Sequence, residues 1–182
     1  DSLEILRQTY ALGARYMTIT HSLTTDWADS ATDAPKHDGL SPFGFEVLAE
    51  MNRLGMIADI SHVSEATMHD VLDKTKAPVL FTHSNARAIT PHPRNVPDSV
   101  LKRLPQNGGV VMVTFVPGFT SAERRQWEYE RSAVGGRAKT EFSGNPVGEK
   151  AAVDAWIAAN PQPKARLAQV ADHRGDGLCD EG

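Results

Sequence analysis

The chain has 182 residues, a length that predicts a single domain. Since 40% of its residues are hydrophobic, the sequence can build a core, which excludes a low-complexity disordered chain. Its 19 lysines and arginines stand against 23 aspartates and glutamates, and a net charge of −4 argues against a module that binds nucleic acid or anionic membranes. The single cysteine, Cys179, excludes an internal disulfide framework and a zinc site made of four thiolates.

The beginning of the chain reads as the start of a helix. Ser2 is placed as an N-cap, apolar residues recur at helical spacing as far as Leu12, and Gly13 is a helix stop. The sequence contains no apolar run long enough for a transmembrane helix, and its first residues do not resemble a signal peptide. We therefore expect a soluble segment of a longer protein, and the compartment is left open.

Strands and helices alternate along the first two thirds of the chain. Apolar runs with the composition of buried strands span residues 15–20, 56–60, 78–82 and 110–115. Amphipathic patterns predict helices between these runs, at 43–54, 64–75 and 97–104. Near-continuous apolar strands separated by helices are typical of a parallel sheet covered by helices, either open or curled toward a barrel. The predicted fold class is therefore α/β.

The composition changes after these strand–helix units, and it predicts four regions. The four strand–helix units occupy 1–118, and a charged, weakly patterned insertion or excursion follows at 119–145. A helical segment is expected at 146–173. The last residues, 174–182, have no periodicity and almost nothing to bury, so we expect a disordered or aberrant tail.

Histidine ends three of the predicted strands, at His21, His62 and His83. Because the carboxyl ends of parallel strands gather at one edge of a sheet, where ligands bind, we expect these side chains to converge. Neutral imidazole at such an edge is a natural zinc ligand. The alternative is three unrelated polar strand ends, because no His-x-x-His pair marks a metal site.

Other polar residues near these strand ends are candidates for the same site. Arg94 either binds a carboxylate through two parallel hydrogen bonds or is a surface arginine beside a proline-rich turn. Asp59, near the end of the second strand, is expected to orient a neighbouring ligand. The residues expected to line the mouth of the site are Asp26, Trp27 and Asp29. His92, in a proline-flanked loop, is interpreted as solvent-facing, and the histidines interpreted as structural or surface residues are His37, His69 and His173.

Three segments carry a family resemblance: RYMTITHSLTTDWADS, GLSPFGFEVLAEMNRLGMIADISHVS and APVLFTHSNARAITPHPRNVPD. In this order they resemble the zinc dipeptidases of the membrane (renal-type) dipeptidase family and their bacterial relatives. The motifs NRLGMIADISHVS and RNVPD are specific, and the match runs from about residue 2 to about residue 119. A weaker likeness continues from 146 to 173, around QVADH.

The resemblance implies a fold, a cofactor and roles for single residues. The implied fold is part of a (β/α)₈ TIM-type barrel of the metallo-dependent hydrolase kind, with a two-zinc centre at its C-terminal face. His62 and His83 match the two histidines that hold one zinc ion. His21 matches a catalytic histidine that contacts the substrate carbonyl and the developing oxyanion, and Arg94 matches the arginine of the substrate pocket. The implied reaction is zinc-dependent hydrolysis of dipeptides, a form of proteolysis.

The sequence also departs from the family. The family's His-x-Asp pair, its bridging Glu and the Asp of its last strand have no counterpart here, and 182 residues fall short of the roughly 250 of a complete barrel. We therefore expect a barrel incomplete at both ends, with part of the zinc ligand set and no hydrolysis by this chain alone.

The alternatives are a non-catalytic half-barrel remnant and, less favoured, another amidohydrolase-like metal enzyme. The expected partner is a dipeptide, nucleic acid is not expected, and a homodimer of the full-length protein is compatible with the family.

Overall fold

The computed structural model of the protein describes residues 2–163 and divides into two compact units, with the division between Thr114 and Phe115. The first unit contains a four-stranded sheet in the order β1–β2–β3–β4, and every neighbouring pair is parallel. The strands are β1 (Tyr16–Thr18), β2 (Ile57–Asp59), β3 (Leu80–Phe81) and β4 (Val110–Val111). The helices are α1 (Leu3–Ala11), α2 (Pro42–Leu54), α3 (Glu65–Lys74), α4 (Asp98–Leu101) and α5 (Leu104–Asn107). The predicted parallel α/β arrangement is confirmed.

The helices α1, α2 and α3 begin at serine N-caps, of which Ser41 was not predicted from the sequence. The hydroxyl groups of Ser2, Ser41 and Ser64 accept hydrogen bonds from backbone N–H groups in the first turns of α1, α2 and α3. These bonds satisfy amides that have no partner within the helix. At its other end α2 stops at Gly55, whose φ of 79° lies in the left-handed region that favours glycine.

Several predicted elements have different bounds in the structure. All four strands are shorter than the apolar runs. At the ends of β2 and β3, the carboxylate of Asp59 accepts hydrogen bonds from the N–H groups of Ser61 and Thr82, which would otherwise extend these two strands. The helix expected at 97–104 is in fact two short helices, α4 and α5. Pro105 has no N–H to continue the helix begun by α4, so a new turn starts at α5.

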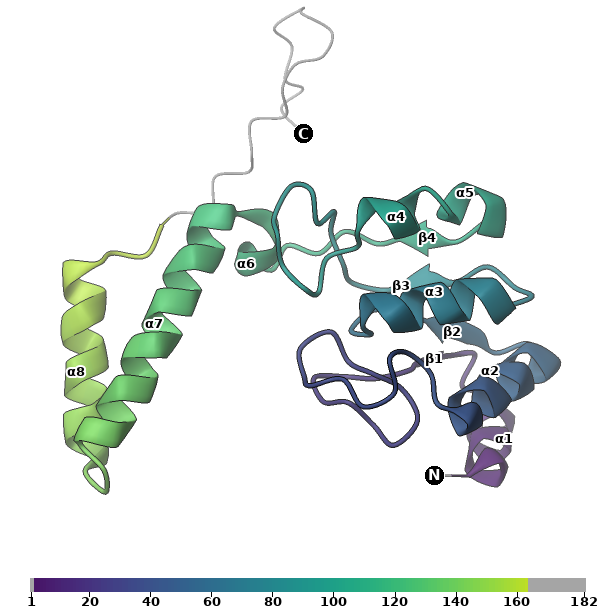
Figure 1. Cartoon of the computed structure of the whole chain (residues 1–182), viewed down its shortest axis with the longest axis horizontal. Helices are drawn as coiled ribbons and strands as arrows, with labels where there is room; N and C mark the ends of the chain where they lie inside the picture. The colour runs from purple at the N-terminus through teal and green to yellow at the C-terminus, as the bar shows by residue number, and fades with distance from the viewer. Residues whose placement is uncertain (1, 164–182) are drawn as a thin grey trace, which may run out of the picture. The chain divides into compact units, whose positions relative to one another are not determined.

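Helices α2, α3 and α4 lie on one face of the sheet (Figure 1). The core of the first unit lies between this face and the helices, and its strand residues include Ile19, Ala58, Ile60, Val79 and Phe81. The opposite face carries the row in which Thr18, Asp59, Leu80 and Val110 are register partners. Exposure varies along this row, since Asp59 is fully buried and Val110 at the sheet edge is 50% exposed.

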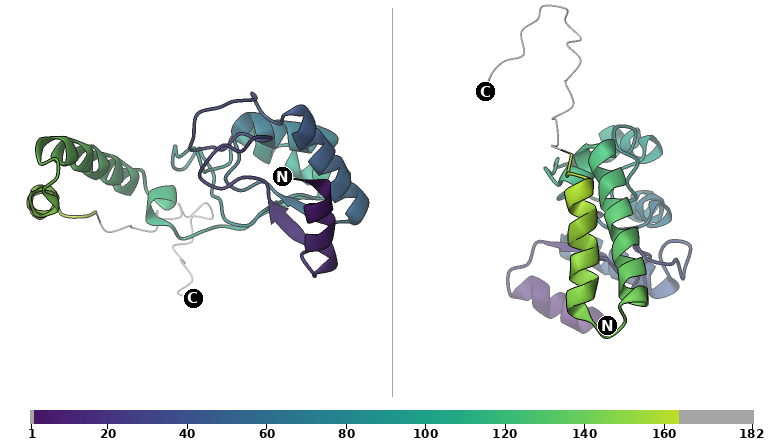
Figure 2. Two further views of the ribbon diagram at one scale, coloured as in Figure 1. Left: turned by 90° about the horizontal axis from the view of Figure 1, so that it is seen from below. Right: turned by 90° about the vertical axis from the view of Figure 1, so that its left-hand side faces the viewer.

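The second unit contains α6 (Pro117–Thr120), α7 (Ala122–Glu141) and α8 (Pro146–Ala159). Helices α7 and α8 lie side by side (Figure 2), and the rings of Trp127 and Trp156 join them at a centroid distance of 5.7 Å. The Trp127 indole N–H also donates to the Asn160 carbonyl at 2.7 Å. Helix α7 thus occupies most of the stretch expected to be a charged insertion.

Parts of the sequence-based predictions fall outside the described residues. These are the end of the helical segment expected at 146–173, with His173, and the whole tail at 174–182, with Cys179. Within residues 2–163, none of the helices combines the length and the apolar character needed to cross a membrane.

Candidate metal centre

The three histidines at the strand ends lie together in the first unit. The rings of His21 and His62 stack with a centroid distance of 4.0 Å, and those of His62 and His83 meet edge-on at 4.8 Å. The Nε2 atoms of His62 and His83 are 2.8 Å apart. The convergence predicted from the strand ends is therefore confirmed, and three unrelated polar strand ends are excluded.

Burial keeps two of these rings neutral. It lowers the pKa of His62 to about 4, with further lowering from the nearby charge of Arg94 and from His21 and His83. Burial and Arg94 also lower the pKa of His83. At neutral pH both imidazoles therefore offer nitrogen lone pairs, which is the form that binds a metal ion.

These residues fit part of a zinc site. Two neutral imidazole nitrogens that face each other at 2.8 Å are suitable donors for a borderline cation such as Zn²⁺. Between Ser2 and Pro163, however, no group of three or more His, Cys, Asp or Glu side chains could hold a metal ion. Since zinc sites use at least three protein ligands, the two histidines could form only part of one.

Arg94 lies beside the histidines and is buried, with only 4% of its surface exposed. One guanidinium nitrogen, Nη2, donates to the backbone carbonyl of His83 at 3.3 Å. Burial lowers the pKa of Arg94 to about 10, although Asp59 partly opposes this, so the side chain stays charged at neutral pH. The interpretation of Arg94 as a surface arginine is therefore wrong. His92 stabilises the loop that carries Arg94, because its Nδ1 accepts a hydrogen bond from the backbone N–H of Arg94 at 3.0 Å.

Asp59, the last residue of β2, lies close to the histidines and is fully buried. Its Oδ2 accepts the hydroxyls of Thr18 and Thr82, each at 2.7 Å. The Thr82 hydroxyl in turn lies 2.8 Å from Nδ1 of His83. Asp59 thus reaches a histidine of the cluster through Thr82, which was not among the predicted site residues although it directly precedes His83.

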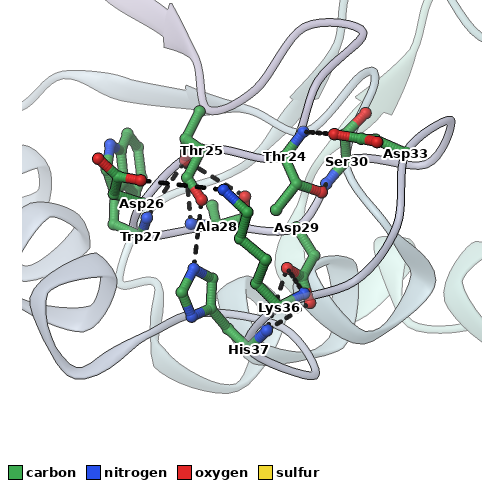
Figure 3. Close-up of polar contacts among 10 residues, drawn as sticks. All are labelled: Thr24, Thr25, Asp26, Trp27, Ala28, Asp29, Ser30, Asp33, Lys36 and His37. Atoms are coloured by element: carbon green, nitrogen blue, oxygen red, sulfur yellow. Dashed lines mark hydrogen bonds and ion pairs between the residues drawn. The ribbon is translucent and has the colours of Figure 1, made fainter.

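The segment between β1 and α2 folds around a buried carboxylate (Figure 3). Asp29 accepts backbone N–H groups of Lys36, His37 and Gly39 at 2.8–3.2 Å. Burial alone would raise the pKa of Asp29, but these hydrogen bonds outweigh it and hold the pKa below its usual value. His37 also contacts the loop, with Nε2 3.2 Å from the Thr25 carbonyl oxygen, which supports its structural interpretation.

The same segment fixes the backbone of two histidines. The Ser30 hydroxyl lies 2.8 Å from the His21 carbonyl oxygen and 3.3 Å from that of His62, to which the Ala31 N–H also donates at 2.7 Å. His62 has a φ of 72°, which is uncommon for a residue with a side chain. These contacts hold His62 in that conformation, and no motif in the sequence indicated this role of Ser30.

Two of the three residues expected to line the mouth of the site have other roles. Asp29 is used inside the loop, and Trp27 is buried in the hydrophobic core. The carboxylate of Asp26 is exposed and lies 3.9 Å from the Lys36 ammonium (Figure 3). For Asp29 and Trp27 the expectation was wrong, because closeness to His21 in sequence does not determine where a loop side chain points.

The chain has clear relatives. A family model described as "Membrane dipeptidase (Peptidase family M19)" matches residues 1–174. Dipeptidase tcpJ of Claviceps purpurea is 52% identical over 124 residues, which are 68% of this chain and 29% of the relative. An uncharacterized dipeptidase of Schizosaccharomyces pombe is 54% identical over 121 residues, covering 65% of this chain and 29% of the relative. The chain thus spans less than a third of the length of these relatives.

Solved structures agree with the sequence matches. A metallo peptidase of Rhodobacter sphaeroides, solved with a phosphinate mimic of the dipeptide L-Ala-D-Ala, is 31% identical with a TM-score of 0.60, over 65% of this chain and 35% of that protein. An amidohydrolase of Pseudomonas aeruginosa is 32% identical with a TM-score of 0.61, over 66% and 36%. The probable dipeptidase PvdM of the same organism, at 24% identity and a TM-score of 0.71, supports the fold over 88% of this chain and 47% of that one.

Proposed function

This chain belongs to the membrane dipeptidase family, peptidase family M19, and we propose that it contributes metal-binding and substrate-binding residues to a zinc-dependent dipeptidase. The observation that supports this most strongly is the 2.8 Å approach of Nε2 of His62 to Nε2 of His83. Both rings are kept neutral by burial, and the charged Arg94 lies beside them. The strand–helix units in the first compact unit of the chain correspond to strand–helix units of the family's (β/α)₈ barrel.

In this proposal His62 and His83 hold a zinc ion through their Nε2 atoms. A zinc ion at this place supplies a Lewis acid that polarises a carbonyl group and promotes the ionisation of water. The protein contributes ligands whose positions are set before the ion binds. The contacts of Ser30 and Ala31 fix the backbone of His62, and the Ser61 hydroxyl accepts the His83 N–H at 3.1 Å.

His21 is proposed to contact the carbonyl of the substrate. Its ring stacks on His62, and Ser22 Oγ lies 3.1 Å from its Nδ1. When the Ser22 hydroxyl donates to Nδ1, the ring proton is on Nε2, which can then donate to a carbonyl oxygen. Such a donor stabilises the negative charge that develops on that oxygen during hydrolysis.

Arg94 is proposed to bind the carboxylate of a dipeptide. A charged guanidinium in a buried position favours a substrate that brings an anion to it, and its planar fork suits a carboxylate. This arrangement selects short peptides, because only there is the terminal carboxylate close to the reacting carbonyl. The dipeptide mimic in the Rhodobacter sphaeroides relative agrees with this substrate class.

Zinc binding by the chain tests the assignment of the ligands. We expect isothermal titration calorimetry to detect weak binding of zinc, because the described residues supply only part of a ligand set. The variants His62→Asn and His83→Gln should lose it. The control His69→Gln should retain it, since His69 lies on α3 and contacts Arg103. Two tightly bound zinc ions, or unchanged binding in both ligand variants, would contradict the assignment.

Activity is tested best in a chimera. The segment of dipeptidase tcpJ that matches this chain at 52% identity would be replaced by the chain's own residues. We expect the chimera to hydrolyse dipeptides with zinc, and the 182-residue chain alone to show no hydrolysis above background. A chimera that folds and binds zinc but hydrolyses no dipeptide would favour the alternative of a non-catalytic remnant.

A further inference from the structure

Asp59 and Thr82, which lie next to the histidines, determine which ring nitrogen of His83 carries the proton. Asp59 is fully buried, and its Oδ1 accepts the N–H groups of Ser61 and Thr82 at 3.0 and 3.1 Å. Its Oδ2 accepts the hydroxyls of Thr18 and Thr82. Burial alone would raise the pKa of Asp59, but these hydrogen bonds hold it below its usual value. The carboxylate therefore only accepts hydrogen bonds.

The Thr82 hydroxyl has one proton to donate. Ser61 Oγ lies 3.5 Å away, at the limit of a hydrogen bond, and two closer neighbours compete for the proton. Asp59 Oδ2 lies at 2.7 Å and His83 Nδ1 at 2.8 Å. If the hydroxyl donated to His83, two oxygen lone pairs would face each other at 2.7 Å inside the protein. The hydroxyl therefore donates to Asp59 and accepts from His83, so the His83 proton must be on Nδ1.

We propose that Asp59 and Thr82 are positioning residues that fix His83 as the Nδ1–H tautomer and thereby present its Nε2 lone pair toward His62. Histidines that bind metals commonly donate their second N–H to a carboxylate, which orients the ring and raises its basicity. Here a threonine hydroxyl connects the two groups. The meaning of this tautomer for zinc rests on the proposed function, whereas the tautomer itself does not.

His62 differs from His83 in this respect. Within residues 2–163, its Nδ1 is buried and has no hydrogen-bond partner. Its Nε2 can therefore donate to the His83 lone pair at 2.8 Å when no ion is bound. Binding a cation through both Nε2 atoms then requires the proton of His62 to leave Nε2, while His83 needs no change. The proton of His83 is thus already on the nitrogen that metal binding requires, whereas the proton of His62 has to move.

Long-range proton–nitrogen NMR correlation of the histidine rings tests the tautomer without metal or activity. In the 182-residue chain, we expect Nδ1 of His83 to be protonated and Nε2 to be bare. Addition of zinc should leave the protonated nitrogen of His83 unchanged. A His83 ring protonated on Nε2 in the unmodified chain would overturn the proposal, whatever the variants do.

Substitutions of matched size separate positioning from simple stability. Thr82→Val should remove the fixed tautomer and weaken zinc binding about 10–100-fold, the usual effect of losing such a partner. Thr18→Val removes a bond to the same Asp59 oxygen but does not touch His83, so it should keep both the tautomer and the zinc affinity. Equal losses in the two variants would contradict the proposal. Thr82→Ser should restore the wild-type behaviour.

Asp59→Asn gives the sharpest test, because it should reverse the chain of hydrogen bonds. The amide oxygen would keep the N–H groups of Ser61 and Thr82, so the amide nitrogen would donate to the Thr82 hydroxyl. Thr82 would then donate to Nδ1 of His83, which moves the ring proton to Nε2. We expect the NMR signature of His83 to invert and zinc affinity to fall. Retention of the Nδ1–H form in a folded Asp59→Asn variant would overturn the proposal.

Discussion

Arg94 illustrates how position changes the chemistry of a single side chain. The sequence around it contains prolines and polar residues, which are typical of an exposed turn, yet the guanidinium is buried next to the carbonyl of His83. Burial removes much of the hydration of this cation, so its attraction to an incoming substrate anion is strong.

In the chimera with dipeptidase tcpJ, Arg94→Ala should lower kcat/KM for dipeptides by about 30-fold or more. Loss of one partner of a buried charge pair costs about 2–5 kcal/mol. Arg94→Lys should restore little, since an ammonium cannot form the planar fork. Steady-state kinetics measures both, with Arg103→Ala, which contacts α3, as the control. A wild-type kcat/KM for Arg94→Ala would remove Arg94 from the substrate site.

Most of the histidine cluster was accessible from the sequence, but its supporting residues were not. His21, His62 and His83 each end an apolar run, and parallel strands bring such ends together. Thr82 was not identified from the sequence because its role depends on the register of β2 against β3. This register brings Thr82 within hydrogen-bond distance of Asp59. Ser30 reaches His62 through the path of a loop, and loop paths have no periodic signal.

At the scale of elements, an ion-pair cluster joins the first two helices. Glu50 of α2 accepts a hydrogen bond from Nε of Arg7 in α1 at 2.6 Å. Arg53 donates hydrogen bonds to both carboxylate oxygens of Glu50 at 2.6–2.8 Å. The hydrogen bonds of Arg53 and then Arg7 lower the pKa of Glu50 to about 2, despite the opposing effect of burial. This carboxylate therefore ties α1 to the sheet-covering helix α2.

Because the pKa of Glu50 is lower in the folded chain than its ordinary value of 4.5, its contribution to stability is present above pH 4.5. That contribution is lost as the pH falls toward 2. Glu50→Gln should therefore be less stable at neutral pH and depend less on pH in this range. Urea unfolding at several pH values measures this, with the exposed Glu46→Gln as the control. The same pH dependence in Glu50→Gln and the unmodified chain would contradict the ion-pair role.

A close approach fixes α2 against the loop before it. A Cβ atom on Gly44 would lie 2.3 Å from the Trp27 carbonyl oxygen, which accepts the Ser41 N–H. Gly44→Ala should destabilise the first unit by about 1–3 kcal/mol, the usual range for overpacking. Gly135→Ala is the control, because a Cβ there meets nothing within 4 Å in helix α7. Thermal unfolding with equal midpoints for both variants would refute the clash.

Helix starts were more predictable than strand ends. Ser2, Ser41 and Ser64 are local signals, since a cap bonds to amides a few residues away. Strands β2 and β3 end where Asp59 accepts hydrogen bonds from amides that the sheet would otherwise use, and one of these amides, that of Thr82, is distant in sequence. Composition cannot reveal that competition.

At the scale of the whole molecule, β4 forms an edge of the parallel sheet. The N–H groups of Val110 and Met112 donate to carbonyls of Val79 and Phe81 on the β3 side. Because amides alternate along a strand, those of Val111 and Val113 point to the other side. Apolar side chains accompany this edge, with Val110 50% and Val113 67% exposed. Such an edge is a template for pairing with another strand.

We therefore expect the 182-residue chain to associate with itself, to an extent that rises with protein concentration. Val113→Lys should shift the chain toward the monomer, because a charged side chain at a strand edge opposes pairing. Val147→Lys is the control, since Val147 is 79% exposed and lies on α8, a helix of the second unit. Sedimentation velocity at several concentrations measures the association. A monomer at every concentration would contradict pairing at β4, and an equal effect of Val147→Lys would place the contact elsewhere.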